Sequence, residues 1–311
     1  MSTIRAVVVD PEVPGRLAIK EVEAPQPEPS QALVKVEAIS LNRGDVMGAM
    51  HFPAGWRPGW DLAGTVLQQA ANGAGPKVGS RVVGSLSAQG AWAEQVAIPT
   101  NYMAELPDSV TFAQAATLPI AGLTALHAVE KGGFLLNKRI LITGSTGGVG
   151  IFAHQFAKLS GAYVVGTARQ AGHEALVREA GADEVVIGED ISSARAFGPY
   201  DLIIESLGGK ALETALTLLG RGGTCVTLGW SATPEGTANI NLINFIQKGG
   251  TTLCAVDWGE SADDLAMLVR LVAGQKLRTP IEVESSWHNI GEVAQRFLQR
   301  QFTGKAVLYL D

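Results

Sequence analysis

The chain has 311 residues, enough for about two domains of roughly 150 residues each. Hydrophobic residues make up 46% and charged residues 17% of it, so the chain can bury a sizeable core and is not disordered as a whole. The net charge of −6 gives no electrostatic basis for binding nucleic acid or an anionic membrane surface. The 37 glycines follow no Gly-X-Y period, so they indicate tight turns or a backbone that lies against a ligand.

Cysteine usage and the N-terminal segment bear on location. Cys225 and Cys254 are the only two cysteines, which excludes a disulfide framework and a four-cysteine zinc site. The segment MSTIRAVVVD lacks the basic-then-apolar layout of a signal peptide, and no apolar run approaches ~18 residues. We therefore expect a soluble cytoplasmic protein without a membrane-spanning segment.

The first part of the chain, up to about Thr111, is rich in predicted strands. Short β-branched or alternating runs separated by Gly and Pro predict strands at 4–9, 33–38, 65–68, 82–85 and 92–98. Alanine-rich helices are then expected at 112–119 and 121–131, before Gly132-Gly133.

The middle of the chain alternates between strands and helices. Strands are predicted at 139–143, 162–168, 184–187, 201–205, 224–228 and 251–256, with helices after Gly148 and around 210–219 and 240–247. The tail adds helices at 261–274 and 290–298 and a strand at 305–310. This order predicts an α/β fold in which a Rossmann-type, doubly wound parallel sheet is inserted into a β-rich domain.

The segment from Gly144 to Gly150 joins the first of these strands to a helix. It reads Gly144-Ser145-Thr146-Gly147-Gly148-Val149-Gly150, with glycines at every third position. Glycines in this context permit a tight turn and let a pyrophosphate approach the backbone at the helix N-terminus. We expect the loop to bind the phosphates of a dinucleotide; the alternative is an ordinary glycine turn.

The end of the next strand indicates which dinucleotide is bound. An NAD site needs Asp or Glu there to bond the ribose hydroxyls, but Gly166-Thr167-Ala168-Arg169 closes this strand. A guanidinium suits a 2′-phosphate, so Arg169 favours NADPH over NADH. Thr167 in the same strand end is a further candidate for cofactor binding. The alternative is that Arg169 is a solvated surface residue.

Several stretches of the chain resemble one enzyme family. They occur in family order at 40–45 (SLNRGD), 58–66 (PGWDLAGTV), 90–94 (GAWAE), 122–125 (GLTA), 143–150 with 166–169, and 302–308 (FTGKAVL). The chain resembles the zinc-independent quinone oxidoreductase (zeta-crystallin-like) branch of the medium-chain dehydrogenase/reductase superfamily. Only the loop and the 58–66 stretch would carry weight singly.

The resemblance implies a domain organisation and a cofactor site. It implies a GroES-like catalytic domain formed by 1–118 plus 257–311, and a Rossmann domain at 119–256. It places Asn42 and Thr124 near the nicotinamide ribose. Three further residues that follow later strands are implied to line the cofactor cleft, namely Ser206, Leu207 and Gly229. Members of the family form homodimers by joining their nucleotide-domain sheets, which makes the strand at 251–256 the expected edge.

The family pattern also indicates whether the chain carries the ligands of a zinc site. Zinc-dependent relatives carry a cysteine within 38–45 and a His-Glu pair after the glycine that corresponds to Gly59. This chain has Asn42 and Asp45 in the first segment and Trp60-Asp61 in the second. The remaining candidate ligands do not complete a three-ligand zinc site, so we expect no metal.

Without zinc there is no Lewis acid to polarise an alcohol oxygen, so the resemblance implies a different hydride acceptor. A quinone or an α,β-unsaturated carbonyl already delocalises negative charge, and NADPH would supply the hydride. Asn42 and Thr124 are candidate donors to the developing negative charge. Asp45 is either a carboxylate in the cleft or a helix-capping residue after Gly44.

Five residues are candidates for the substrate wall: Met47, Phe52, Trp56, Trp230 and Trp258. Aromatic rings suit a flat apolar substrate, and ordinary core packing is the alternative. Relatives often carry a tyrosine near the position of Met47, so its absence keeps both quinone and enone acceptors open. A different class also remains open: an NADPH-binding structural or interaction protein with little or no turnover.

Overall fold

The computed structural model describes residues 2–233, 235–257, 259 and 261–311. Contacts divide the chain into two units, one formed by Met1–Leu123 with Gly259–Asp311 and the other by Thr124–Trp258. The first boundary falls after Leu123 instead of after residue 118, because residues up to Leu123 pack in the first unit. The backbone N–H of Ile120, for example, donates to Oδ1 of Asp61 at 2.9 Å.

The second unit is built on a six-stranded parallel sheet with the strand order β10-β9-β8-β11-β12-β13. Its strands are β8 (Arg139–Ile142), β9 (Tyr163–Ala168), β10 (Glu184–Ile187), β11 (Tyr200–Glu205), β12 (Leu219–Thr227) and β13 (Thr252–Ala255). Counted along the chain, this is the 3-2-1-4-5-6 order of dinucleotide-binding folds. The strand order reverses between β8 and β11, and ligands of such sheets bind where the loops of those two strands leave the carboxyl edge.

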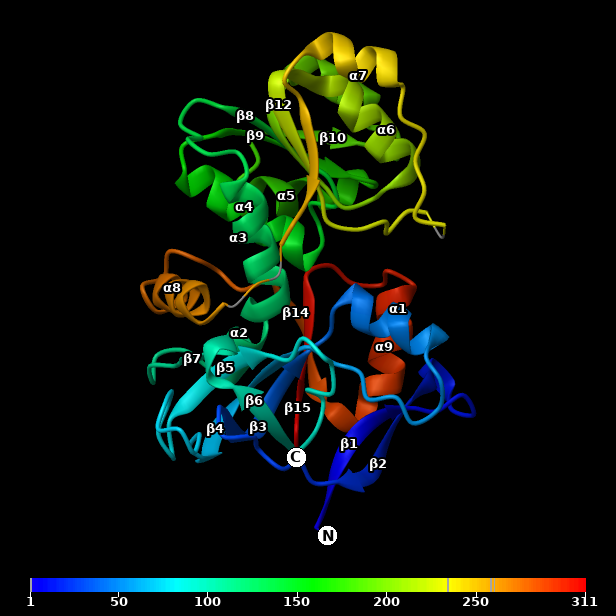
Figure 1. Ribbon diagram of the computed structural model, residues 1–311. Helices are drawn as coiled ribbons and strands as arrows, with labels where there is room; N and C mark the ends of the chain where they lie inside the picture. The colour runs from blue at the N-terminus through cyan, green and yellow to red at the C-terminus, as the bar shows by residue number, and fades with distance from the viewer. Residues whose placement is uncertain (1, 234, 258, 260) are drawn as a thin grey trace. The chain divides into compact units, whose positions relative to one another are not determined.

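The second unit also contains helices, several of which bury apolar residues against the parallel sheet. They are α3 (Leu123–Glu130), α4 (Gly148–Leu159), α5 (Glu174–Ala180), α6 (Gly209–Leu218) and α7 (Leu242–Lys248), with 3₁₀ turns η4 (Ala171–His173) and η5 (Ile191–Phe197). In α4, Phe152, Phe156 and Ala157 recur at helical spacing and are all buried. Figure 1 shows α6 and α7 packed side by side next to β12.

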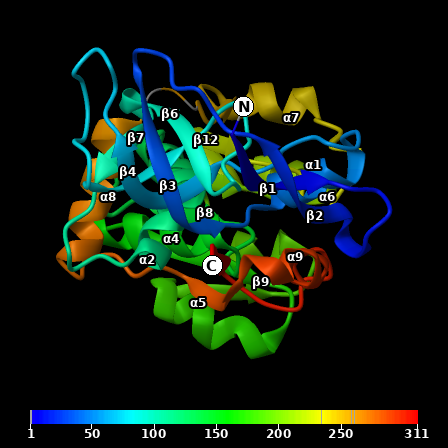
Figure 2. The same ribbon diagram turned by 90° about the horizontal axis from the view of Figure 1, so that it is seen from below.

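The first unit contains a mixed sheet with β3 at its centre. Its strands are β3 (Gln31–Ser40), β4 (Asp61–Gln68), β5 (Arg81–Ser85), β6 (Gln95–Pro99), β7 (Met103–Glu105), β14 (Ile281–Ser286) and β15 (Lys305–Tyr309). One edge of β3 pairs with β4, and the other pairs with β6 near its start and β15 near its end. Figure 2 shows β3 running across this sheet, with the separate pair β1 (Thr3–Val9) and β2 (Leu17–Glu23) beside it. Residues from both ends of the chain therefore complete one sheet.

The remaining elements of the first unit surround this sheet. They are α1 (Arg43–His51), α2 (Phe112–Ala116), α8 (Ala262–Ala273), α9 (Ile290–Leu298), the π-helical turn η3 (Leu118–Gly122), and the 3₁₀ turns η1 (Pro14–Arg16), η2 (Thr100–Tyr102) and η6 (Trp287–Asn289). Trp92 and Trp287 are fully buried in its core. Gly59 has φ +104° and lies against Trp92, where a Cβ atom would come within 2.3 Å of the indole ring. Within the described part of the chain, no helix has the length and apolar character needed to cross a membrane.

Candidate functional site

The loop between β8 and α4 needs some of its glycines for the fold itself. Gly144 has φ +62°, and a Cβ atom there would lie 2.3 Å from Oγ of Ser206. A Cβ on Gly150 would lie 2.4 Å from the carbonyl oxygen of Gly144. Both contacts are far inside van der Waals distance, so these two glycines allow the turn and the close packing of α4 against it.

Gly147 and Gly229 are different, because the fold leaves room for a side chain at both positions. Gly147 has φ −86° and ψ 166°, which any residue adopts, and its nearest neighbour to a built Cβ is 3.4 Å away. The corresponding distance at Gly229, just after β12, is 3.7 Å. The absence of a side chain at these positions leaves bare backbone in the loop after β8, which is at the switch point, and after β12, the strand next to β11. A closely approaching pyrophosphate requires such bare backbone.

The Ser145 hydroxyl holds the loop in place, and the backbone of Thr167 bonds to it. The Ser145 hydroxyl donates to the carbonyl of Ile142 at 2.8 Å and accepts from the backbone N–H of Thr167 at 2.9 Å. Ser145 is fully buried. Thr146, Gly148 and Val149 are only partly buried, and they belong to the segment that begins α4, where helical N–H groups have no intrahelical partner. This is the part of the loop that can meet an anion.

A buried carboxylate, Glu205, organises the loop that follows β11. Its Oε1 accepts from the N–H of Leu207 at 2.8 Å and from the hydroxyl of Thr143 at 3.2 Å, and its Oε2 accepts from the N–H of Gly208 at 3.0 Å. Burial raises the pKa of Glu205, while the backbone hydrogen bonds oppose that rise. The N–H of Ser206 donates to the Thr143 hydroxyl at 2.9 Å. These bonds couple the two loops of the switch point.

Arg169 follows the last residue of β9 and is exposed. Among the described residues it has no hydrogen-bond or ion-pair partner, so its five N–H groups are available to a ligand. β9 neighbours β8 in the sheet, so Arg169 lies one strand away from the glycine loop at the same carboxyl edge.

The first unit contains a cluster of buried polar side chains, which we call the Lys305 cluster. It comprises Ser40, Asn42, Asp45, Asp61 and Lys305. The ammonium of Lys305 donates to the carbonyl of Leu41 at 2.9 Å, to Oδ1 of Asn42 at 2.5 Å and to Oδ2 of Asp61 at 3.3 Å. Asn42 is 8% exposed, whereas the other members are 0–2% exposed. Asn42 is therefore where the cluster reaches the surface of the unit.

Asp45 caps the start of α1 and touches no open surface. Its Oδ2 accepts from the backbone N–H and from the carboxamide of Asn42, both at 3.1 Å. Its Oδ1 is buried and has no partner among the described residues. Burial, with the negative charge of Asp61 nearby, raises the pKa of Asp45 well above its usual range. Burial lowers the pKa of Lys305, while the two carboxylates oppose that shift.

The expected substrate residues fall into separate groups. Phe52 and Trp56 stack at 4.4 Å between ring centroids and 17° between planes, just after α1, and Met47 is half-buried on α1. Trp230 belongs to the second unit and is 62% exposed, whereas Trp258 lies outside the described residues. Thr124, at 4% exposed, lies in α3. Of the five residues expected to form the substrate wall, the structure brings the rings of Phe52 and Trp56 into contact.

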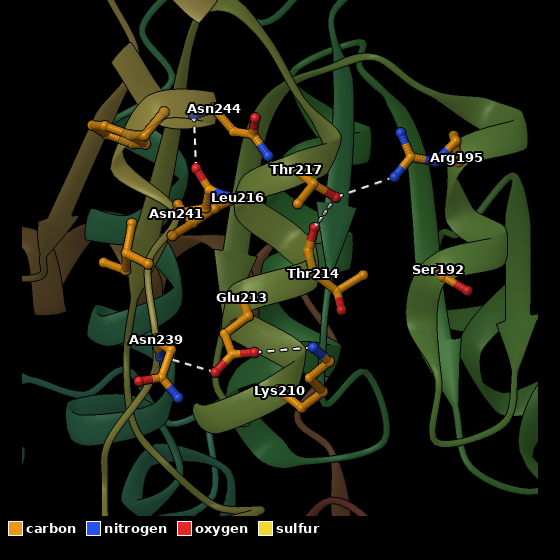
Figure 3. Close-up of a pocket in the computed structure, with 12 residues that line it drawn as sticks. Ser192, Arg195, Lys210, Glu213, Thr214, Leu216, Thr217, Asn239, Asn241 and Asn244 are labelled. Atoms are coloured by element: carbon orange, nitrogen blue, oxygen red, sulfur yellow. Dashed lines mark hydrogen bonds and ion pairs between the residues drawn. The ribbon is translucent and has the colours of Figure 1, made fainter. Parts of the chain in front are cut away.

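A hollow of about 330 Å³ lies elsewhere, between η5, α6 and the segment 239–245 (Figure 3). Its charged groups are largely paired within it: Glu213 accepts from Lys210 at 3.1 Å and from the N–H of Asn239 at 2.8 Å, and Arg195 donates to Thr217 at 3.2 Å. It contains none of the expected site residues. Gly147, Gly229 and Arg169 follow β8, β12 and β9 along the carboxyl edge of the parallel sheet instead.

Among the described residues, no three His, Cys, Asp or Glu side chains are grouped so that they could hold a metal ion.

Three residues with structural roles near the expected site were not predicted from the sequence: Thr143, Glu205 and Lys305. Glu205 had one signal in the sequence, an acidic residue that ends an apolar strand next to Ser206.

A parallel sheet of this order, with a glycine loop at its switch point and inserted into a second, β-rich unit, defines a class of NAD(P)-binding oxidoreductases. The family described as alcohol dehydrogenase GroES-like domain matches residues 28–108, and that described as zinc-binding dehydrogenase matches residues 148–274. A chloroplastic quinone-oxidoreductase of Triphysaria versicolor is 31% identical over 98% of each chain. A 2-methylene-furan-3-one reductase of Solanum lycopersicum is 31% identical over 69% of this chain and 59% of its own.

Solved structures have the same fold. A quinone oxidoreductase of Pseudomonas syringae has a TM-score of 0.86 at 25% identity and covers 98% of this chain and 99% of its own. A mycobacterial protein complexed with NADPH has a TM-score of 0.86 at 22% identity, covering 98% and 99%. The chain belongs to the quinone oxidoreductase branch of the medium-chain dehydrogenase/reductase superfamily. It is an oxidoreductase of the quinone oxidoreductase and enone reductase type.

Proposed function

We propose that the protein is a zinc-independent, NADPH-dependent oxidoreductase that transfers a hydride to a quinone or an α,β-unsaturated carbonyl compound. The observation that carries this proposal is the bare backbone at Gly147 and Gly229, where the fold does not need glycine and a bound dinucleotide does. The names of the relatives, quinone oxidoreductase and 2-methylene-furan-3-one reductase, support the two acceptor classes.

The residues at the switch point fit NADPH. The segment Gly144–Gly150 would hold the pyrophosphate, Ser206, Leu207 and Gly229 would line the cleft, and Thr167 and Arg169 would receive the adenosine end. An unpaired guanidinium at the end of β9 favours a 2′-phosphate over a free pair of ribose hydroxyls. The mycobacterial neighbour that binds NADPH supports the same choice.

The donor set of the first unit supports a reaction without zinc. The segment that supplies zinc ligands in other members of the superfamily carries Asn42 and Asp45, and the second segment carries Asp61. The space between these side chains is taken by the Lys305 ammonium, 3.3 Å from Asp61. A positive group already neutralises this carboxylate, so a divalent cation would meet repulsion there.

Bound NADPH supplies the hydride, and the chain supplies position and environment. We assign Asn42 and Thr124 to the nicotinamide ribose. We assign Asp45 to the support of Asn42, because it is fully buried and bonds to that residue twice. Met47, with the stacked rings of Phe52 and Trp56, offers a flat apolar surface, and Trp230 adds an exposed indole. A planar conjugated acceptor suits such a surface.

The reaction is tested by NADPH oxidation with a panel of quinones and enones. We expect turnover with at least one acceptor, undiminished by chelators, and no stoichiometric zinc by metal analysis. Chelator-sensitive activity with one zinc per chain would refute the zinc-free reaction. Tight NADPH binding without turnover on any acceptor would favour a structural or interaction protein.

Cofactor choice is tested separately with Arg169→Ala. Removal of the guanidinium should weaken NADPH binding about tenfold or more and leave NADH binding nearly unchanged, because only NADPH has the phosphate. Arg221→Ala removes another exposed arginine of the second unit, on β12, and is the matched control. Equal loss for both nucleotides in Arg169→Ala would refute the role.

We further propose a homodimer that forms through β13, the edge strand of the parallel sheet. The adjacent helix α7 exposes Leu242, Ile243 and Ile246 by 64%, 67% and 72%, which suits burial against a second copy. Sedimentation should give a dimer, and Ile243→Glu should give a monomer.

We also propose a cytoplasmic location, with which the two free cysteines agree. Cell fractionation tests it, because relatives include chloroplastic and mitochondrial proteins.

A further inference from the structure

A second hollow of the second unit, of about 400 Å³, adjoins the hollow in Figure 3. The two share Arg195, Thr217 and Asn244, and the second is completed by Gln247 and Lys248. We call it the Thr217 hollow. Its described lining consists of two cations, a hydroxyl and two carboxamides, with no acidic side chain.

The Thr217 hollow lies at the amino edge of the parallel sheet. Thr217 is in the last turn of α6, and β12 begins two residues later at Leu219. Lys248 ends α7, shortly before β13, and η5, which carries Arg195, leads into the start of β11. The six residues of β11 rise about 3.3 Å each, so roughly 20 Å separates this edge from the carboxyl edge that carries the glycine loop. The hollow is therefore distinct from the expected nucleotide site.

Two positive charges meet at Thr217. Nη2 of Arg195 donates to the Thr217 hydroxyl at 3.2 Å, and Nζ of Lys248 donates to the Thr217 carbonyl at 3.0 Å. Lys248 also donates to the carbonyl of Leu219, so it caps the end of α6. Burial lowers the pKa of Lys248, and the positive charge of Arg195 lowers it further. The two cations therefore repel each other while one residue holds both.

None of these bonds balances the positive charge. The partners of the two cations are a hydroxyl and two carbonyls, and neither cation forms an ion pair with a described residue. Lys210 in the adjoining hollow differs, because it is paired with Glu213 at 3.1 Å. An anion from solution would supply the charge that the Thr217 hollow lacks.

The hollow also has unused hydrogen-bond donors. A guanidinium has five N–H groups and an ammonium has three. Arg195 uses one of its five on a described residue, and Lys248 uses two of its three. The carboxamides of Asn244 and Gln247 line the same hollow. A phosphate group has several acceptor oxygens for such donors, and near neutral pH its charge approaches −2, which matches two cations.

We propose that the Thr217 hollow binds a phosphate dianion between Arg195 and Lys248, either inorganic phosphate or the phosphate group of a monoester. The Arg195 guanidinium and the third N–H of Lys248 bind the oxygens, and the Thr217 hydroxyl positions the guanidinium. A carboxylate or a phosphate diester carries a single negative charge and leaves one cation unbalanced. The site does not depend on the proposed reaction.

Binding is measured at Lys248 itself, in protein without nucleotide. In protein labelled with ¹³C-lysine, the ε-methylene signal of Lys248 is assigned by its loss in Lys248→Gln. It is followed at constant ionic strength and about pH 7.5, where a phosphate monoester is mostly dianionic. Inorganic phosphate and glycerol 2-phosphate should give a saturable shift, and dimethyl phosphate, a monoanion, should bind at least about tenfold more weakly. A shift with only one of the two dianions identifies the source of the phosphate group.

Substitution of Arg195 tests the second cation. Arg195→Met should weaken dianion binding at Lys248 at least about tenfold, and Arg195→Lys, which keeps the charge, should recover part of it. Arg169→Met removes an exposed arginine at the opposite edge of the same sheet and is the matched control, with a Lys248 response like that of wild type.

Four results would each overturn the proposal. They are no saturable shift of Lys248 with either dianion, equal binding of dimethyl phosphate, wild-type binding in Arg195→Met, and loss of the Lys248 response in Arg169→Met. The last result would mean that the signal reports phosphate bound at the carboxyl edge. Because neither NADPH nor a hydride acceptor is present, all four are independent of the proposed function.

Discussion

His154 is expected to make the second unit sensitive to acid. The imidazole lies on α4, is 0% exposed, and has no hydrogen-bond partner for either ring nitrogen among the described residues. It packs over Gly166 of β9, where a Cβ atom would come within 2.8 Å of the ring. A charged imidazolium has no water and no acceptor there, so burial lowers the pKa of His154 from 6.5 to about 3.

The sign and size of the effect follow from linkage. A histidine whose pKa is lower in the folded state binds its proton preferentially after unfolding. Its contribution to stability is therefore complete above 6.5 and is lost as the pH falls toward 3. Between about pH 7.5 and pH 5, this amounts to a loss of about 2 kcal/mol in the free energy of unfolding.

His154→Leu removes the titration and keeps a side chain of similar volume. Native-state hydrogen exchange of the α4 and β9 amides, corrected for intrinsic rates, reports on the second unit alone. Wild type should lose about 2 kcal/mol more protection than His154→Leu over this pH interval. His51→Leu removes an exposed histidine of the first unit and serves as the control. Parallel pH profiles for wild type and His154→Leu would refute the reasoning.

Three further substitutions test the glycine loop, the turn after β11 and the buried acid. Gly147→Ala should melt like wild type but bind NADPH at least about tenfold more weakly, whereas Gly150→Ala should be destabilised; unchanged binding in Gly147→Ala would argue against a pyrophosphate there. In urea titration, the free energy of unfolding of Glu205→Ala should be at least about 2 kcal/mol lower than that of wild type. Glu205→Gln, which keeps Oε1 as an acceptor, should lose much less. Burial raises the pKa of Asp45, so the folded state holds its proton more tightly than the unfolded state and loses this advantage as the pH rises above 3.8. Urea titration should therefore show Asp45→Asn gaining stability relative to wild type as the pH rises above that value.

The elements that the sequence predicted best carry a strong local signal. The parallel strands are apolar on both faces, and α4 has a regular apolar stripe after its glycines, so their positions follow from periodicity. The sequence offered a helix after Gly44 only as one of two alternatives, because the segment contains Gly44 and Gly48 and has no such stripe. Helix α1 forms because Asn42 and Asp45 cap it and because Gly44 leaves room for the ring of Trp60.

Contacts between distant parts of the sequence account for most of what was missed. The strand β2 has a single buried residue and carries several charges, and it forms because it pairs along its whole length with β1. The role of Lys305 depends on side chains that are 244 and 263 residues away, Asp61 and Asn42. The sequence motif that contains Lys305 does not indicate which carboxylate forms an ion pair with the lysine. The expected break between two helices near Pro119 was also local reasoning, and the structure bridges it with a π-helical turn.

The position of β15 near the end of the chain determines the order in which a nascent chain can fold. The second unit is continuous in sequence and can complete its sheet as soon as β13 has been synthesised. The first unit must wait for β15, which closes the free edge of β3 and brings the ammonium that Asp61 and Asn42 require. During translation the inserted unit therefore matures before the unit that surrounds it, reversing the usual N-terminal-first order. A chain that stops before Lys305 would release a finished nucleotide-binding unit attached to an unfinished partner with an open strand edge, a target for chaperones and proteases.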